Sequence, residues 1–515
     1  MHTVDSIFAA VAAENGAATH LVFTDGRSCS YGETFQRASR LAAVLAEAGI
    51  EPGDRVACLL GNSRALYEFF IGCAMAGAIA VPINTLSMAR ETAALFADCQ
   101  PRGIVAQAAL RAALPDKMFS DDVVVRLLCD GDGAALTGGW LDYESVLAGA
   151  PNGEFASRSR PGDAAVIAYS SGTTGMPKGI VLGHRQLLAN AKMVTKTLRY
   201  GPNDRFLTIL PSFHIFGFSF DFLYSGLVRA RLVVLPAFDA EMAIDLIEKH
   251  RITVLAGVPL MFVQMFDPGQ LGGRDVSSMR LIDVGGGPVP VSLVRQLKED
   301  IGIDTVESYG LTEITTVACV QRPGEPSPEG SCGVVLDGIE VRVCDPDDNE
   351  VAADVPGELQ FRCGTFMLSY WGQPELTVAT LKDGWLHTGD IGRVDADGNI
   401  FILDRIKDMI VSNGYNVFPK EVENVLFGHP SVQSAAVIGV PHEVRGEDVQ
   451  AFVVPAPGAD PAAEEILQYC RQQLARYKVP RGVIFTDALP LTASGKIRRF
   501  ALRQSLQTAA QENIT

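Results

Sequence analysis

Helical and strand-like hydrophobic patterns alternate along the first 330 or so residues. Apolar positions recur at helical spacing over 35–48 and 63–76, and residues 53–60 between them have the pattern of a turn that leads into a buried strand. Further strands are expected at 164–169, 205–210, 231–235, 254–256 and 281–284, with helices at 241–249 and 291–300. This alternation predicts an α/β fold in which helices cover layered sheets.

Beyond about residue 330 the pattern changes to short strands and turns. Turn sequences such as Asp345-Pro-Asp-Asp-Asn predict a β-rich subdomain over about 330–404. The last part combines amphipathic helices at 420–427 and 462–474 with a strand at 434–438. We therefore expect a large N-terminal domain over 1–404 and a small α+β domain over 405–515, with the boundary near 404–408.

Length and charge exclude several classes of protein. A chain of 515 residues is expected to form about three domains or subdomains. The 60 acidic residues outnumber the 43 basic ones, so the net charge of −17 disfavours binding to nucleic acid or to an anionic membrane surface. The longest apolar stretch, 69–83, is interrupted by glycine and proline and is shorter than the roughly 20 residues of a membrane-spanning helix.

The cysteines indicate a reducing compartment. Ten cysteines are scattered along the chain without a C-x-x-C pair, as expected of buried thiols and not of a disulfide framework or a zinc site. The N-terminus has no basic segment before its alanine-rich run, so a secretory signal is not expected. These features predict a cytoplasmic protein. A homodimer is a candidate assembly that the sequence does not decide.

The segment from Tyr169 to Gly179 follows a predicted strand and is rich in glycine and hydroxyl groups. Glycines let backbone N–H groups approach an anion, hydroxyls add donors, and Lys178 adds a positive charge, so the segment resembles a phosphate cradle. It does not have the Walker A spacing, and Gly285-Gly-Gly287 does not fit G-x-G-x-x-G. A nucleotide phosphate site is predicted, but not one of the P-loop or Rossmann type.

The same segment carries a resemblance to a known family. Ser170-Ser-Gly-Thr-Thr-Gly-Met-Pro-Lys178 matches every position of the AMP-binding signature of the acyl-adenylate-forming (ANL) superfamily. Six further segments are similar to family motifs and follow in family order, so the resemblance spans nearly the whole chain: 211–217, 285–288, 308–313, 384–390, 404–408 and 492–497. It implies an acyl-CoA synthetase that uses ATP, Mg²⁺ and CoA.

The resemblance also implies roles at the nucleotide site. Asp390 would hold the ribose hydroxyls, Tyr309 would stack on adenine, and Glu313 would bind Mg²⁺, for which a hard carboxylate oxygen is a suitable ligand. Arg405 would lie near the same sugar or the α-phosphate. The full set expected to bind ATP or AMP is Ser170, Ser171, Gly172, Thr173, Thr174, Gly175, Lys178, Gly286, Gly287, Ser308, Tyr309, Gly310, Thr312, Asp390 and Arg405.

The resemblance implies two reactions in one site: a carboxylate first attacks the α-phosphorus of MgATP to give acyl-AMP, and a thiol then displaces AMP to give a thioester. These two reactions require two arrangements of the groups around the site. The resemblance implies that Lys496 enters the site during adenylation and that the C-terminal domain then rotates about Lys407. Gly414 and Tyr415 lie in the loop that would face CoA during thioester formation. His214 is interpreted as a pocket or gating residue and not as a base, because a carboxylate substrate is already ionised at neutral pH.

The acyl pocket is expected to be apolar. Its candidate residues are Phe213, Val258, Gly285, Leu311 and Val317. The stretches around them contain no lysine or arginine, which favours an aryl or aliphatic monocarboxylate. Asp221 lies in the 213–222 segment, where an enzyme that activates amino acids would usually have an aspartate for the α-ammonium group; its register, which decides whether it could take that role, stays open.

The sequence thus predicts an ATP-dependent acid:CoA ligase. Two alternatives remain at this point: an adenylating enzyme that loads a separate carrier protein, and a non-catalytic nucleotide-binding regulator. The presence of Lys496, Asp390 and Glu313 together argues against the regulator, which has no chemical need for all three.

Overall fold

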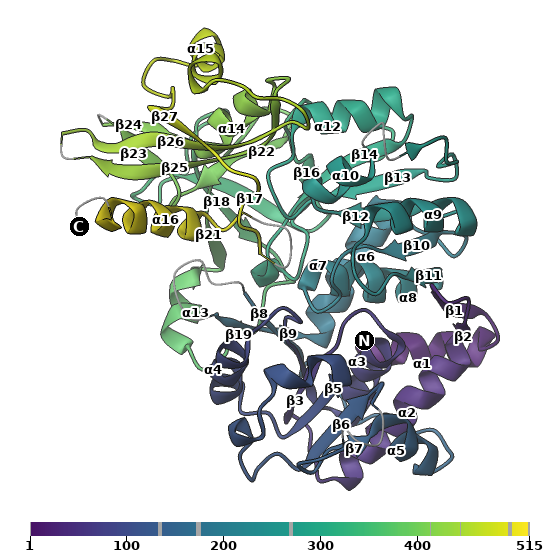
Figure 1. Ribbon diagram of the computed structural model, residues 1–515. Coiled ribbons are helices and arrows are strands. Elements are labelled where there is room, and N and C mark those ends of the chain that lie inside the picture. Colours follow the sequence, from purple (N-terminus) through teal and green to yellow (C-terminus); the bar gives the residue numbers. More distant parts are fainter. Residues whose placement is uncertain are drawn as a thin grey trace.

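The computed structural model describes residues 2–131, 136–170, 177–266, 271–412, 414–442, 444–492 and 497–512, with side chains to residue 506. The described strands form four sheets. Figure 1 shows the two large sheets with their helices in the N-terminal and central parts of the chain, and the C-terminal strands gathered with α14, α15 and α16 at the upper left.

The first large sheet has nine strands and supplies most of the strand ends discussed below. Its order is β16 (Val334–Val335), β15 (Cys319–Val320), β14 (Asp304–Tyr309), β13 (Leu281–Val284), β12 (Val254–Gly257), β10 (Arg205–Thr208), β11 (Arg231–Val234), β1 (Thr19–Phe23) and β2 (Ser28–Ser30). The strands from β14 to β1 run parallel to their neighbours. Their carboxyl ends therefore meet at one edge, where α/β sheets usually bind ligands.

The second large sheet has eight strands. Its order is β19 (Ser369–Tyr370), β9 (Gly179–Gly183), β8 (Ala164–Tyr169), β4 (Ile79–Pro82), β3 (Arg55–Leu59), β5 (Gly103–Gln107), β6 (Val125–Cys129) and β7 (Leu141–Asp142). β8 and β9 are antiparallel, so the segment between them is a hairpin connection. β19 extends the sheet beyond β9 although it lies almost two hundred residues later in the chain.

Helices cover both large sheets. They are α1 (Val4–Asn15), α2 (Tyr31–Glu47), α3 (Arg64–Ala76), α4 (Ala89–Cys99), α5 (Tyr143–Gly149), α6 (His184–Thr197), α7 (Ile215–Gly217), α8 (Ser225–Val228), α9 (Ala240–His250), α10 (Pro259–Met265), α12 (Val291–Arg295) and α13 (Pro374–Thr380). A buried π-helical segment, Phe218–Tyr224, joins α7 to α8. α2 begins a turn before the predicted position 35, because Ser30 and Glu33 form a capping box in which each side chain accepts the other's backbone N–H.

The remaining two sheets are smaller. The third contains β17 (Glu340–Cys344), β18 (Gly357–Arg362), β21 (Trp385–Val394) and β20 (Leu381–Lys382), with β22 (Ile400–Arg405) paired to β21. The fourth contains β24 (Tyr415–Val417), β23 (Ile410–Ser412), β26 (Gly446–Pro455) and β25 (Val432–His442), with β27 (Gly482–Phe485) on β26. α14 (Pro419–Phe427), α15 (Ala463–Gln473) and α16 (Arg499–Glu512) accompany it. The α/β prediction and its layered sheets are confirmed.

Burial follows this division of the chain. One large apolar core joins the nine-stranded sheet to one face of the eight-stranded sheet, and a smaller core covers the other face. The fourth sheet has apolar clusters of its own. All ten cysteines are free thiols, as predicted, and nine are buried. In the described part of the chain, the helices are too short or too polar to cross a bilayer.

Candidate active site

The hairpin between β8 and β9 presents the base of the predicted phosphate cradle. The Ser170 N–H donates to the Lys178 carbonyl oxygen at 3.0 Å, which fixes both ends of the connection. The Lys178 Nζ lies 5.4 Å from the centre of the Tyr370 ring on β19. Ser171, Gly172, Thr173, Thr174 and Gly175 lie outside the described residues, so their predicted role stays a prediction.

The end of β14 and the turn that follows it carry several of the predicted residues. Tyr309 ends the strand, and Thr312 and Glu313 follow in a single 3₁₀ turn over 312–314. The hydroxyl of Tyr370 donates to Glu313 Oε1 at 2.8 Å, and the Met367 N–H donates to the Glu313 carbonyl at 2.7 Å. Tyr370 was missed in the sequence, where nothing connects it to a carboxylate 57 residues away.

Asp390 is the best-buried carboxylate among the predicted nucleotide ligands, with 3% of its surface exposed. Its Oδ2 accepts a hydrogen bond of 2.6 Å from the Tyr309 hydroxyl. Its Oδ1 lies 2.9 Å from Arg405 Nε in an ion pair that lacks hydrogen-bond geometry, so this buried oxygen has no hydrogen-bond donor among the described residues. Buried polar atoms are normally satisfied, so this oxygen is suited to a donor from a ligand.

Strand pairing brings Asp390 and Arg405 together. The two residues are partners in the register of β21 and β22. The negative charge of Asp390 raises the pKa of the Arg405 guanidinium above its usual value. Burial, followed by the same carboxylate, holds the pKa of the Tyr309 phenol well above its usual value. Tyr309 is therefore a hydrogen-bond donor to Asp390 at neutral pH.

The glycines that follow β13 pack closely against neighbouring residues and leave little room for a side chain. Gly286 has φ of +76°, and a Cβ there would lie 3.3 Å from Val258 Cγ1 and 3.6 Å from Phe216 Cδ1. At Gly285 a Cβ would lie 2.7 Å from the Ser308 hydroxyl oxygen. That hydroxyl donates to the buried Asp283 at 2.6 Å. The glycines thus let this strand end pack closely against Ser308, Val258 and Phe216, and Phe216 lies in the segment 213–218 that was predicted to border the acyl pocket.

The backbone is strained just after the 3₁₀ turn over 312–314. Thr315 and Thr316 have φ of +73° and +142°, a region that β-branched residues rarely adopt. Their segment is held by Ser219, whose Oγ lies 2.6 Å from Thr316 Oγ1, and by Asn190, whose amide donates to the Val317 carbonyl at 2.8 Å. Val317 is buried and Leu311 partly buried against the same core. Strain of this kind often accompanies a functional site.

His214 and Asp221 lie in or next to the segment 213–218, which was predicted to border the acyl pocket. His214 caps α7, and its Nδ1 accepts the Phe216 N–H at 3.3 Å; Phe213 beside it is half-buried. Asp221 is fully buried in the π-helical segment and accepts a hydrogen bond of 2.8 Å from Ser212. Burial raises the pKa of Asp221 well above the usual value and so favours its neutral form. A neutral carboxyl has no negative charge to pair with an α-ammonium group.

The expected hinge follows β22. The Ile406 N–H donates to the Gly389 carbonyl at 2.9 Å. Partial desolvation, and then Arg405, lower the pKa of Lys407. Asp404 accepts the Lys420 N–H at 3.0 Å, and Arg503 on α16 lies 3.3 Å from Asp408, so the hinge contacts the C-terminal elements.

The predicted CoA loop lies between β23 and β24. Gly414 has φ of +80°, and the Tyr415 ring is exposed and stacks on Tyr477 with the ring centres 4.7 Å apart. Lys496 falls in 493–496, outside the described residues. Where side chains are described, three or more His, Cys, Asp or Glu residues do not gather in a group able to hold a metal ion.

Comparison with known proteins identifies the family. The sequence model described as AMP-binding enzyme matches residues 8–371, and that described as AMP-binding enzyme C-terminal domain matches 421–496. A feruloyl-CoA synthase of Amycolatopsis sp. is 36% identical over 93% of this chain and 94% of its own. A fatty acid:acyl-carrier-protein ligase, ScoC, of Streptomyces coeruleorubidus is 34% identical over 95% and 94%. The structure of ATP-bound MatB from Rhodopseudomonas palustris has 30% identity and a TM-score of 0.88, and the match covers 98% and 99% of the two chains. The chain therefore belongs to the family of AMP-binding enzymes, the acyl-adenylate-forming superfamily that its motifs resemble.

Proposed function

We propose that this protein is an ATP-dependent carboxylic acid:CoA ligase. A substrate carboxylate attacks the α-phosphorus of MgATP and releases pyrophosphate, and the thiol of CoA then displaces AMP from the acyl-adenylate to give a thioester. The observation that carries the proposal is the meeting of Tyr309, Asp390 and Arg405 beside the carboxyl end of β14, with one buried carboxylate oxygen left for a ligand.

The nucleotide is held by groups from three parts of the fold. Asp390 accepts the ribose hydroxyls, and the ring of Tyr309 lies against adenine over the open backbone at Gly286 and Gly287. Arg405 forms an ion pair with the Asp390 carboxylate and adds positive charge beside the sugar or the α-phosphate. The remaining ATP contacts come from Ser308, Gly310, Thr312 and the segment from Ser170 to Lys178.

Glu313 suits the Mg²⁺ that accompanies ATP. Mg²⁺ in nucleotide sites usually takes one or two carboxylates together with phosphate oxygens and water. Tyr370 engages one oxygen of Glu313, so the carboxylate keeps lone pairs for the ion. The ion neutralises charge on the phosphates, and Lys178 and Lys496 add cations on the same side.

The acid is an aryl or aliphatic monocarboxylate. Phe216 and Val258 both lie close to Gly286, and Val317 is also buried, so the residues of the candidate pocket are apolar. Phe213, Gly285 and Leu311 complete it, and His214 gates it. The relative named as a feruloyl-CoA synthase supports an aromatic acid, while the one named for a fatty acid supports an aliphatic chain.

The acceptor thiol has one alternative source. A carrier protein is the acceptor in the name of the second relative, so loading of a phosphopantetheine arm is the competing function. Gly414 and Tyr415 would line the path of either pantetheine group. Rotation of 405–515 about Lys407 brings this loop to the site after adenylation.

The free thiols support a cytoplasmic enzyme. A homodimer stays a prediction, which analytical ultracentrifugation tests.

One experiment tests both steps. Pyrophosphate release is measured with MgATP and a panel of aryl, alicyclic and aliphatic acids, each with CoA, with holo-carrier protein or with neither. Acid-dependent release together with an acyl-CoA product supports the ligase. Pyrophosphate release with acyl transfer to the carrier protein and none to CoA shows that a carrier protein is the acceptor. An absence of pyrophosphate release across the whole panel contradicts the proposed function.

A further inference from the structure

Asp390 lies in an irregular part of β21. In the register of β18 and β21, Glu358 pairs with Ile391 and Gln360 with His387, so a single residue of β18 faces three residues of β21. The three are Thr388, Gly389 and Asp390. This bulge turns the strand, and Gly389 takes the left-handed φ of +68° that the turn requires. The predicted ribose ligand is thus aimed by a bulge and not by regular strand geometry.

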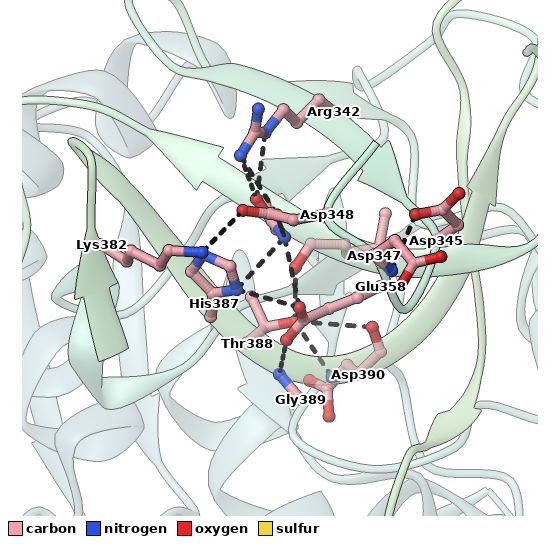
Figure 2. Close-up of polar contacts among 12 residues, drawn as sticks. Arg342, Asp345, Asp347, Asp348, Glu358, Lys382, His387, Thr388, Gly389 and Asp390 are labelled. Atoms are coloured by element: carbon pink, nitrogen blue, oxygen red, sulfur yellow. Dashed lines mark hydrogen bonds and ion pairs between the residues drawn. The ribbon is translucent and has the colours of Figure 1, made fainter. Parts of the chain in front are cut away.

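One carboxylate on the neighbouring strand holds that bulge. Glu358 Oε1 accepts the Gly389 N–H at 2.9 Å, and Glu358 Oε2 lies 3.1 Å from His387 Nδ1. Thr388 completes the attachment, since its hydroxyl donates to the Leu359 carbonyl at 2.7 Å and accepts the Asp390 N–H at 3.0 Å. Figure 2 shows Glu358 reaching His387 and Gly389, with Thr388 and Asp390 beside them.

Glu358 is itself fixed from the far side. The buried Gln360 amide donates to Glu358 Oε2 at 3.2 Å and to Asp348 Oδ1 at 2.8 Å. Asp348 also accepts from Lys382 at 3.0 Å, and Arg342 donates to Gln360 Oε1 at 2.7 Å. These contacts form a continuous polar network from a surface turn to the backbone of Gly389 (Figure 2). A group restrained on both sides can hold a ligand in one geometry.

We propose that Glu358 is a positioning residue that sets the Asp390 carboxylate for the ribose hydroxyls of the nucleotide. The inference rests on the proposed function of Asp390. Glu358 acts through the backbone of Gly389, whose N–H it accepts. Its loss lets the bulge relax, after which Asp390 keeps its charge pair with Arg405 but loses its alignment with the ribose.

The test is the selectivity for ribose hydroxyls, which a merely structural role would not change. Dissociation constants of MgATP and of its 2′-deoxy and 3′-deoxy analogues are measured by titration calorimetry for the wild type, Glu358→Ala and Glu358→Gln. Hydrogen bonds to a charged group predict that the wild type prefers MgATP to at least one analogue by about tenfold or more. We expect this preference to fall below about threefold in Glu358→Ala and to recover partly in Glu358→Gln, which keeps an acceptor oxygen.

Two further variants keep the test decisive. Glu33→Gln is the matched control, because Glu33 also accepts a backbone N–H, at 2.7 Å, but lies at the start of α2. Thr388→Val removes the second attachment of the bulge and replaces Glu358→Ala if the latter does not fold. A wild type without ribose selectivity refutes the role of Asp390 and with it this inference. If the wild type is selective and the Glu358→Ala and Thr388→Val variants are as selective as the wild type, the positioning role of Glu358 is overturned. The role of Asp390 as the ribose ligand is not contradicted by that result.

Discussion

Among the glycines of the candidate site, Gly310 leaves the least room for a side chain. Its replacement by alanine therefore tests whether the backbone geometry here is part of the site. A Cβ at this position would lie 1.6 Å from the Thr316 carbonyl oxygen and 2.8 Å from Val317 Cα. To reach even 3.0 Å from that oxygen, the two backbone segments would have to separate by about 1.4 Å. The atoms that a Cβ would meet are backbone atoms, which cannot move away by a side-chain rotation.

The segment opposite Gly310 has little freedom to move. Thr316 is tied to Ser219 on the π-helical segment, and Val317 is tied to Asn190 on α6. The displacement therefore falls on Gly310 and its neighbours, which include Tyr309 and Glu313. Overpacking of this kind costs about 1–3 kcal/mol of folding free energy. A misplacement of about 1 Å in a catalytic group lowers the rate roughly a hundredfold.

We therefore expect Gly310→Ala to lower acid-dependent pyrophosphate release by about a hundredfold while the protein still unfolds cooperatively. Gly201→Ala is the matched control, since a Cβ there meets no atom within 4 Å and the residue does not have a left-handed φ. It should keep wild-type activity and stability. The assays are pyrophosphate release at saturating ATP and thermal unfolding by calorimetry. If Gly310→Ala keeps activity within about threefold of the wild type, the tight approach is not part of the site and the reasoning fails.

Four other changes test separate parts of the proposal. Lys496→Ala should abolish adenylation but leave thioester formation from supplied acyl-AMP largely intact; equal loss in both assays would refute its role in one step. Lys407→Pro should do the reverse by stiffening the hinge, and an equal fall in adenylation would contradict the hinge. Tyr370→Phe should raise the KM for MgATP about threefold to tenfold without changing that for the acid, whereas Tyr143→Phe, which also loses a 2.8 Å bond to a carboxylate, should not. Burial raises the pKa of Asp283 from 3.8 to about 7, so the folded state keeps a proton that the unfolded chain releases, and this group makes stability fall as the pH rises through that window. The stability of Asp283→Asn relative to the wild type should therefore increase between pH 4 and 7 and stay level above it, as followed by urea unfolding; a pH-independent difference would contradict the burial argument.

Much of the fold follows from local patterns. The strands predicted at 164–169 and 281–284 coincide with β8 and β13, because a short apolar run bounded by turn residues is sufficient to indicate a buried strand. The start of α2 was also readable, since Ser30 and Glu33 have the spacing of a capping box, although the apolar pattern alone placed the start at 35. Strand order was not readable. β19 joins β9 across almost two hundred residues, and no local pattern carries that pairing.

The candidate site divides in the same way. Asp390, Glu313 and Tyr309 were predicted as site residues because each lies in a short contiguous motif, but the contacts that orient them come from elsewhere. Tyr309 reaches Asp390 across 81 residues, Tyr370 reaches Glu313 across 57, and Glu358 reaches Gly389 across 31. A single sequence contains the types of these residues and not their proximity, so candidate ligand-binding groups could be proposed from motifs and the residues that orient them could not.

The supports share one physical property, which is that they maintain backbone that departs from regular geometry. The bulge at 388–390 needs Glu358 and Thr388, and the left-handed Thr315 and Thr316 need Ser219 and Asn190. Irregular backbone is unfavourable by itself, so it persists only where surrounding groups compensate for it. Both irregular segments lie beside the carboxyl end of β14, one through Tyr309 and the other through Gly310. The residues that sequence reasoning missed are therefore concentrated at the site because the site is where the chain is least regular, which is also where propensity and periodicity carry the least information.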